Sequence, residues 1–261
     1  MTIFKHELKQ NKKSLIIWTV AIASLLAICL FLFPEMKGEM DSVSQVFSSM
    51  GEFSAAFGMD KVSFGTLIGF YSVECGNILG LGGAFFAAFT AVTVLAKEEK
   101  DHTGEFLLTH PVSRYGVVTG KLISVLTQIA VLNIVIYLVA IGSIVVIGEE
   151  IPWKEITLLH IAYFLMHIEL GGICFGISAF LRRGSIGIGL GIAIMMYFLN
   201  IITNISESTE FLKYITPFAY AEGSEIVSNL SLDLPLVILG VSYGIAGIIC
   251  GYIKYTKKDI A

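Results

Sequence analysis

The sequence predicts an all-α integral membrane protein in which six helices cross the bilayer and form a single transmembrane domain, residues 1–261. Three observations lead to this fold class. Hydrophobic residues make up 55% of the chain and charged residues only 15%, and the mean hydropathy is +0.80, far from the balance of a soluble domain. Several segments reach the roughly 20 apolar residues needed to cross about 30 Å of hydrocarbon. The connectors between them are too short to fold as independent domains.

The elements follow in chain order. Residues 1–13 carry Phe4 and Leu8 on one side and several lysines on the other, which predicts an amphipathic elbow helix on the membrane surface; a plain positively charged flank is the alternative. The expected spans are residues 14–33, 66–96, 117–147, 156–181, 185–203 and 234–253. The second and third exceed the length a bilayer needs, so we expect them to tilt or to extend beyond it.

The distribution of basic residues predicts the orientation. An even number of spans puts both termini on one side, and 13 of the 17 Lys and Arg residues fall on that side. Because basic residues collect on the cytoplasmic side, we expect cytoplasmic N- and C-termini. The net charge of −4 sums two separated surfaces, so it does not indicate an acidic or nucleic-acid partner.

Two longer outer connectors are predicted to contain short helices. In residues 34–63, apolar residues recur close to every 3.6 positions after Asp41, which predicts an amphipathic helix on the outer face. In residues 204–233, Pro217 marks a break between two short helices rather than a seventh span.

Small residues inside the spans predict packing surfaces. Glycines at spacings of three or four allow close approach of membrane helices, and they occur at Gly76, Gly80 and Gly83 and again at Gly187 and Gly191. The four cysteines all lie inside expected spans without a CxxC motif, so they are interpreted as small apolar residues.

Catalytic and cofactor motifs are not found in the sequence. It contains no HExxH, GxSxG or calcium-loop pattern. The segment Gly116–Leu122 comes nearest to a phosphate-binding loop, but it has one residue too few between the glycines and Leu where a hydroxyl is needed. We therefore expect no cofactor, no metal site and no ATP hydrolysis on this chain alone.

Ionisable groups inside spans are costly and usually functional or paired. Glu74 lies in the second span, and His160, His167 and Glu169 lie in the fourth. Two residues turn a helix by about 200°, so Glu169 should point away from His167. Hydrogen-bonded structural groups and a polar patch on a transport path or subunit interface, through Glu74, His167 and Glu169, both remain open. A metal site would need further ligands nearby in the sequence, and none is evident. The same interpretations remain open for the polar residues Gln128, Asn133 and Asn200.

The loop of residues 97–116 on the expected cytoplasmic side is the most distinctive feature. Thr103 to His110 is predicted to form a short helix with an apolar part at Phe106, Leu107 and Leu108, ended by Pro111. Ser113 is a plausible cap for the next helix. The short helix could rest on the membrane surface or insert into a groove of a cytosolic partner, and the residues alone favour neither.

This loop also carries a resemblance. The pattern Glu-x-x-x-x-Thr-Gly-Glu-x-Leu-Leu-x-x-Pro-Val-Ser-Arg, from Glu98 to Arg114, followed by Gly120-Lys121, resembles the first cytoplasmic loop of ATP-binding-cassette (ABC) transporter permeases of the type 2 exporter class. The basic N-terminus resembles that family's elbow helix. Tyr214 to Tyr220 is similar to its outer segment before the last span, with Thr216 in place of Ser, and the tail from Tyr255 to Ile260 is similar as well.

The resemblance implies a half-size permease subunit. It would pair with a second permease, identical or homologous, and with two copies of a separate ABC ATPase subunit that bind ATP and Mg. It implies a bacterial plasma-membrane protein that exports a hydrophobic or amphipathic substrate such as an antimicrobial peptide. The residues implied to couple to the ATPase are Glu98, Thr103, Gly104, Glu105, Phe106, Leu107, Leu108, Pro111 and Arg114.

Two rival functions remain open at this point. One is an intramembrane enzyme that uses Glu74, Glu169 and the two histidines as acid-base or metal groups. The other is a secondary transporter driven by protons through Glu169, which internal inverted repeats would support.

Overall fold

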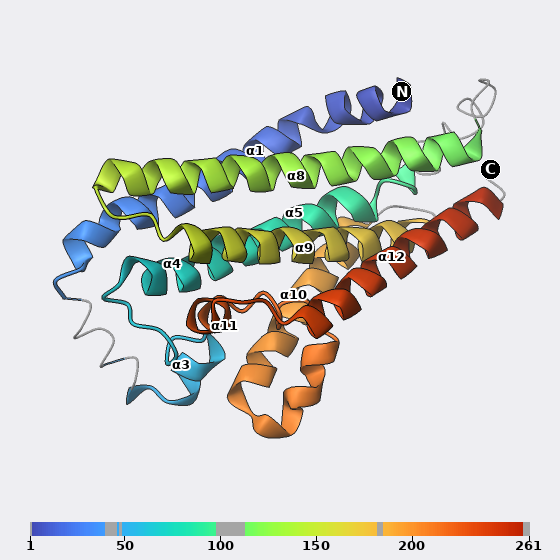
Figure 1. The fold of residues 1–261 in the computed structure, drawn as a ribbon. Coiled ribbons are helices and arrows are strands. Elements are labelled where there is room, and N and C mark those ends of the chain that lie inside the picture. The colour runs from blue at the N-terminus through green and yellow to red at the C-terminus, as the bar shows by residue number, and fades with distance from the viewer. Residues whose placement is uncertain (1, 40–45, 47–48, 98–112, 182–184, 258–261) are drawn as a thin grey trace.

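In the computed structural model, residues 2–39, 46, 49–97, 113–181 and 185–257 are described. In this part of the chain the structure is helical and contains no strand. Six helices are long and apolar enough to cross a membrane, which confirms the predicted fold class. Both ends of the chain lie at the same end of the bundle (Figure 1). The opposite end, which the distribution of basic residues predicts to face outward, is called the outer end below.

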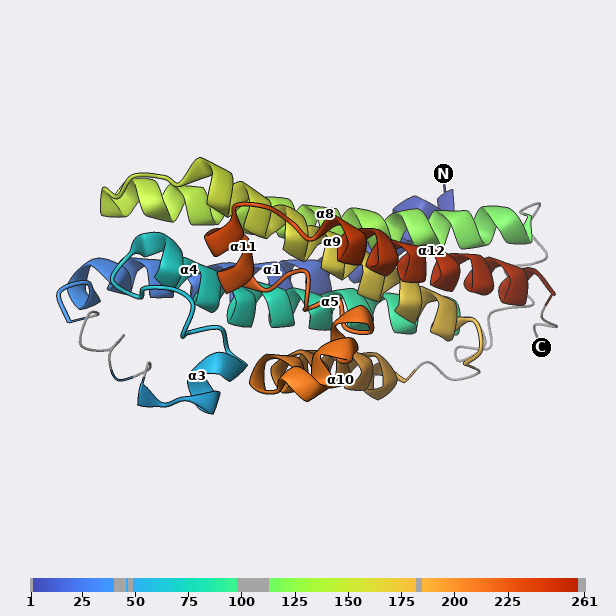
Figure 2. The same ribbon diagram turned by 60° about the horizontal axis from the view of Figure 1, so that its bottom comes forward.

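The six crossing segments keep the predicted order with shifted ends. Their bounds are α1 Thr2–Met36; α4 Leu67–Cys75 with a π-helical turn Gly76–Gly80 and α5 Leu81–Val92; α8 Arg114–Ile147; α9 Trp153–Ser178; α10 Ile186–Ile205; and α12 Leu234–Lys257. α9 lies at the centre, between α5 and α12. α1 pairs with α8, and α10 packs against α5 on the opposite side (Figures 1 and 2).

The N-terminal segment differs from expectation, because residues 2–13 do not form a separate elbow helix. α1 is a single helix from Thr2 to Met36. The change from charged to apolar sequence near Ser14 contains no Gly or Pro, so nothing in the backbone ends the helix there. The segment is also held inside the fold, since Glu7 is only 3% exposed.

Side-chain caps fix the beginnings of three crossing helices. Thr66 Oγ1 accepts from Gly69 N at 3.2 Å before α4, and Ser113 Oγ accepts from Gly116 N at 3.1 Å before α8. Asp233 Oδ1 accepts from Leu236 N at 3.2 Å before α12. Each bond satisfies a backbone donor that the helix leaves open. The predicted cap at Ser113 is thereby confirmed.

The closest helix approach is between α9 and α12. A Cβ added at Gly172 would lie 2.6 Å from Gly244 O, and one at Gly176 would lie 2.3 Å from Gly247 O. The backbones therefore touch where only glycine fits, as small-residue interfaces in membranes allow.

The glycines predicted to pack have mixed outcomes. Gly83 lies against the His167 ring, where an added Cβ would be 2.2 Å from Cε1, and Gly76 and Gly80 lie against Tyr163. These confirm the second-span surface. The prediction for α10 is wrong within this chain, because Gly191 has no atom within 4 Å of an added Cβ and Gly187 only its neighbour Ser185 at 3.7 Å.

The outer connectors return toward the bundle. Between α1 and α4 the structure describes the short helix α3, Glu52–Ala56, and part of the longer helix expected there lies outside the described residues. Between α10 and α12 a 3-10 helix, Glu207–Tyr214, and α11, Gly223–Asn229, flank the segment that contains Pro217. The predicted pair of short helices is thus confirmed. α11 packs against α4 and α9.

Candidate functional site

The two ends of the 97–116 loop are tied to the first and last helices. On one side, the Lys97 ammonium lies 3.6 Å from Glu7 Oε2 and donates to Gln10 on α1. On the other side, Arg114 Nη1 donates to the carbonyl of Thr256 in the last turn of α12 at 3.2 Å. A displacement of this loop would therefore act directly on α1 and α12.

The implied coupling residues between these ends are outside the described residues. These are Glu98, Thr103, Gly104, Glu105, Phe106, Leu107, Leu108 and Pro111. Of the implied set, the structure places only Arg114, at the first position of α8. The role of the loop stays a prediction.

A buried charge pair lies next to the loop ends. Lys121 is 0% exposed. Its ammonium donates to Val94 O at 2.5 Å and lies 3.3 Å from Glu7 Oε1. Charges removed from water are tolerated only with close partners. Glu7 thus links α1 to α8 and, through Lys97, to the loop.

His167 is a buried, hydrogen-bonded residue at the centre of the bundle. Its Nδ1 lies 3.1 Å from Asn133 Oδ1 on α8, and its Nε2 lies 3.1 Å from Gly80 O at the end of the π-helical turn. A π-helical turn shifts the backbone hydrogen-bond pattern locally. The histidine therefore joins three crossing segments at one point.

Glu169 points to a different side of α9, as two residues of helical rotation predict. Its Oε2 accepts from the Tyr220 hydroxyl at 2.8 Å. It lies against α12, where a Cβ added at Gly240 would be 2.2 Å from the same oxygen. This contact holds the outer segment with Tyr220 against the bundle.

Glu74 is separate from both residues. Cys29 Sγ on α1 donates to its Oε2 at 3.9 Å. The structure therefore does not bring Glu74, His167 and Glu169 into one site. In the described part of the chain, no group of three or more His, Cys, Asp or Glu side chains is placed to hold a metal ion.

Removal of the Tyr220 hydroxyl should lower stability measurably. Tyr220→Phe leaves a buried carboxyl oxygen of Glu169 without its donor, and we expect the free energy of unfolding to fall by about 1–3 kcal/mol. Thermal unfolding of the detergent-solubilised chain measures this. Tyr214→Phe in the same segment is the matched control, since Tyr214 is 51% exposed; equal effects of the two changes would contradict the role of the hydrogen bond.

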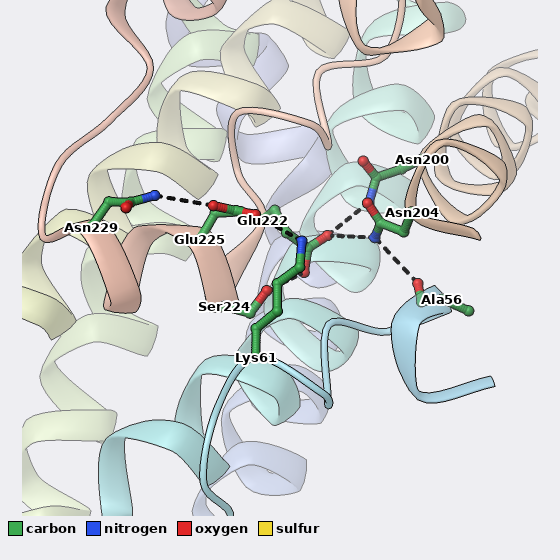
Figure 3. A network of polar contacts seen from close by, with 8 residues as sticks. All are labelled: Ala56, Lys61, Asn200, Asn204, Glu222, Ser224, Glu225 and Asn229. Atoms are coloured by element: carbon green, nitrogen blue, oxygen red, sulfur yellow. Dashed lines mark hydrogen bonds and ion pairs between the residues drawn. The ribbon is translucent and has the colours of Figure 1, made fainter. Parts of the chain in front are cut away.

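The largest polar network lies at the outer end (Figure 3). Glu222 Oε2 accepts from Asn200 Nδ2 at 2.9 Å and from Asn204 Nδ2 at 3.1 Å, both on α10. Asn204 also donates to Ala56 O of α3 at 3.3 Å. The carboxylate of Glu222 therefore joins α10 to the segment before α11, and Asn204 adds α3.

A second acidic residue of this network is neutralised by a lysine. Lys61 lies 2.7 Å from Glu225 Oε1, and Asn229 donates to Glu225 Oε2 at 3.0 Å. Burial lowers the pKa of Lys61, but the hydrogen bond and charge of Glu225, together with the charges of Glu222 and Asp60, outweigh it, so the pKa is raised above its usual value. Lys61 is therefore charged and held by Glu225.

These side chains border a pocket of about 630 Å³ that is mainly polar. Its wall includes Asn200, Asn204 and Glu222 together with Lys213, Glu210 and Asp233. A pocket of this size can hold a small molecule or part of a larger one. The polar lining suits the binding of a polar group.

Comparison with known proteins decides the family. Residues 1–259 match the sequence profile of a family described as "ABC-2 family transporter protein". This chain belongs to the ABC-2 transporter family. A search of curated proteins gives no match.

As an ABC-2 permease, the chain is a multi-pass membrane transport component, and its six apolar helices agree with this. In this ABC-2 permease the residues that build the outer pocket were largely missed by sequence reasoning. Asn200 was noted, but Glu222, Asn204 and Lys61 lie in or next to connectors, and their partners are distant in sequence. The sequence signal for them was the acidic character of the outer connectors, which hold 13 of the 21 Asp and Glu residues.

Proposed function

We propose that this ABC-2 permease forms the translocation pathway of an ABC exporter as one of two permease subunits, identical or homologous. It acts with two copies of a separate ATPase subunit that bind ATP and Mg. The observation that carries this proposal is the family match over residues 1–259. The cytoplasmic position of both termini, a bacterial plasma membrane and an amphipathic substrate such as an antimicrobial peptide belong to the same proposal.

The contacts at the loop ends support the coupling step. Lys97 is tied to α1 through Glu7 and Gln10, and Arg114 is tied to α12 through Thr256. When the ATPase dimer closes on ATP, it would displace the loop between these ends. The permease pair, which would have two conformations, would then shift toward one of them.

Helix exposure supports the pairing of two permeases. The apolar windows of α1, α10 and α12 are mostly not buried in the single chain, whereas those of α4–α5 and α9 are mostly buried. The exposed faces are available to lipid and to a second permease.

The intramembrane enzyme is not favoured by the geometry. His167 contacts Asn133 and Gly80, whereas Glu169 contacts Tyr220 and α12. The two side chains share no centre at which one reacting atom could sit. A requirement for ATP in transport by reconstituted vesicles would separate the ABC exporter from a proton-driven carrier.

Co-purification tests the ATPase partnership. The chain is isolated from its native membrane in mild detergent and its companions are identified by mass spectrometry. We expect a stoichiometric companion with a complete Walker A motif. A homo-oligomer without any ATPase would contradict the proposal.

Substitution of the loop tests where the ATPase docks. Phe106→Asp and Glu105→Arg should each abolish co-purification of the ATPase while membrane insertion stays intact, because an apolar anchor and a charge would be lost from a helix-in-groove contact. Phe106→Leu is the conservative control and should retain association. Unchanged co-purification of both disruptive variants would contradict the coupling role of the loop.

A further inference from the structure

The Glu222 carboxylate lies between two pockets of different size. The outer pocket has a volume of about 630 Å³, and a small cavity of about 40 Å³ lies beneath it. Glu222 and Asn200 line both. The two pockets therefore adjoin at these two side chains.

Glu222 differs from the other glutamates of this pocket because no cation is in ion-pair contact with it. Lys61 is bound by Glu225 at 2.7 Å and Lys213 by Glu210 at 2.5 Å. Within the described residues, Glu222 forms no ion pair with a Lys, Arg or His side chain. Its Oε2 accepts two neutral amide donors, and Ser224 Oγ lies 3.4 Å from Oε1. The carboxylate is thus hydrogen-bonded without an ion pair of its own, although its charge contributes to the raised pKa of the nearby Lys61.

Two buried polar atoms of the small cavity lack partners among the described residues. Asn200 is 6% exposed, and its Oδ1 has no hydrogen bond; Tyr163 is 1% exposed, and its hydroxyl has none. Both side chains line the small cavity with Glu222. Buried polar groups are nearly always paired, so these two atoms indicate a missing polar occupant.

An occupant that donates hydrogen bonds and carries positive charge matches these groups. Asn200 uses its Nδ2 on Glu222, so its free Oδ1 only accepts. The Tyr163 hydroxyl also accepts, and the carboxylate accepts and attracts a cation. A primary ammonium has three N–H donors on a compact charge, which matches three oxygen acceptors. A calcium ion would need six to eight oxygen ligands.

The position of the cavity fits a point on a transport path. Tyr163 lies ten residues after Trp153, so the cavity is about 15 Å below the outer end of α9. Gly223 of α11 adjoins it, since an added Cβ there would be 2.4 Å from Ser72 O of α4 and 3.1 Å from the Tyr163 hydroxyl. The outer connector therefore forms part of the wall at this depth.

We propose that Glu222, Asn200 and Tyr163 bind a primary ammonium group of the transported substrate, with the rest of that substrate in the outer pocket. This assignment rests on the proposed transport function and adds the substrate class, a molecule that bears a primary amine. The ammonium group enters the small cavity, donates to the three oxygens and neutralises Glu222. The ion pairs Lys61–Glu225 and Lys213–Glu210 are kept.

Equilibrium binding of a simple diamine tests the site. The full chain in lipid nanodiscs is dialysed against radiolabelled 1,5-diaminopentane at constant ionic strength, so that diffuse attraction to the surface is screened. We expect saturable binding. Pentamethonium, which carries the same two charges at the same spacing but no N–H, should not compete. Equal competition by pentamethonium, or no saturable binding because the cavity holds only ordered water, would overturn the proposal.

Three variants locate the site. Glu222→Gln should weaken binding at least 10-fold. Asp233 lines the same outer pocket, and Asp233→Asn removes the same charge. Because Asn also caps a helix, the cap of α12 is kept. The dissociation constant of the diamine should therefore stay within about 2-fold. Tyr163→Phe should weaken binding by about 3- to 10-fold without lowering the thermal stability, because the hydroxyl has no partner among the described residues. Equal losses in Glu222→Gln and Asp233→Asn would overturn the proposal, and Tyr163→Phe keeps the test decisive if Glu222→Gln does not fold.

The outcome is separable from that of the proposed function, because binding needs no ATPase. An ATPase that co-purifies with a chain lacking saturable diamine binding would overturn only the ammonium site. Diamine binding that depends on Glu222 in a chain without an ATPase would support the site and contradict only the ABC mechanism.

Discussion

Gly176→Leu should prevent the chain from folding. α9 and α12 meet backbone to backbone at this position, and a Cβ alone would lie 2.3 Å from Gly247 O. Real Cβ atoms do not come this close, and the obstacle is a backbone carbonyl rather than a side chain that could rotate. The two helices would have to separate, and overpacking of this kind costs more than about 3 kcal/mol when the neighbours cannot yield.

The measurement is the fraction of monodisperse chain after detergent extraction, followed by its thermal unfolding. Gly142→Leu in α8 is the matched control, since nothing lies within 4 Å of an added Cβ there. Both changes replace glycine by a better helix former, so helix propensity favours both equally. A monodisperse Gly176→Leu chain with unchanged thermal unfolding would contradict the close contact between α9 and α12.

The crossing helices could be predicted because each one is determined by its own segment of the sequence. In a bilayer every backbone N–H and C=O must be hydrogen-bonded within its own segment, so a long apolar segment is expected to form a helix. The errors are at the ends, where α9 begins at Trp153 and α12 extends to Lys257. These ends depend on caps and neighbouring segments, which hydropathy does not measure.

Partners across the fold could not be predicted in the same way. The spacing of glycines marked Gly187 and Gly191, yet in this chain neither lies against another helix, whereas Gly172 and Gly176 meet Gly244 and Gly247. Small residues permit close approach but do not say which helix approaches. The helix end expected near Ser14 is absent for a related reason. A charged segment can continue a helix when its charges pair with residues that are distant in the sequence.

The outer pocket shows the same limit. Sequence reasoning noted Asn200 as a polar residue inside a span, but its partner Glu222 follows Pro217 in a connector. Nothing in the sequence marks Tyr163 as a pocket residue, because aromatic residues are common in apolar helices. Only the folded arrangement shows that the Asn200 oxygen and the Tyr163 hydroxyl have no partner among the described residues and share a cavity with the Glu222 carboxylate.

Glu7→Gln should destabilise the chain by about 3–5 kcal/mol, because it removes the carboxylate beside a buried ammonium. Lys121 is 0% exposed, and its Nζ lies 3.3 Å from Glu7 Oε1. Gln keeps the shape of Glu but not its charge, so the effect reports the charge itself. Thermal unfolding of the detergent-solubilised chain measures it, and Glu149→Gln is the control. Its partner Lys37 is 48% exposed, so the control should cost less than about 1 kcal/mol.

A second substitution separates the charge effect from a loss of packing. Lys121→Met removes the buried ammonium, and the double variant Glu7→Gln with Lys121→Met should therefore be more stable than Glu7→Gln alone. Recovery should be partial, because Lys121 also donates to Val94 O at 2.5 Å. A double variant no more stable than Glu7→Gln would show that Glu7 acts through packing alone. Partial recovery would establish that this ion pair holds α1 against α8 beside Lys97, at one end of the loop proposed to contact the ATPase.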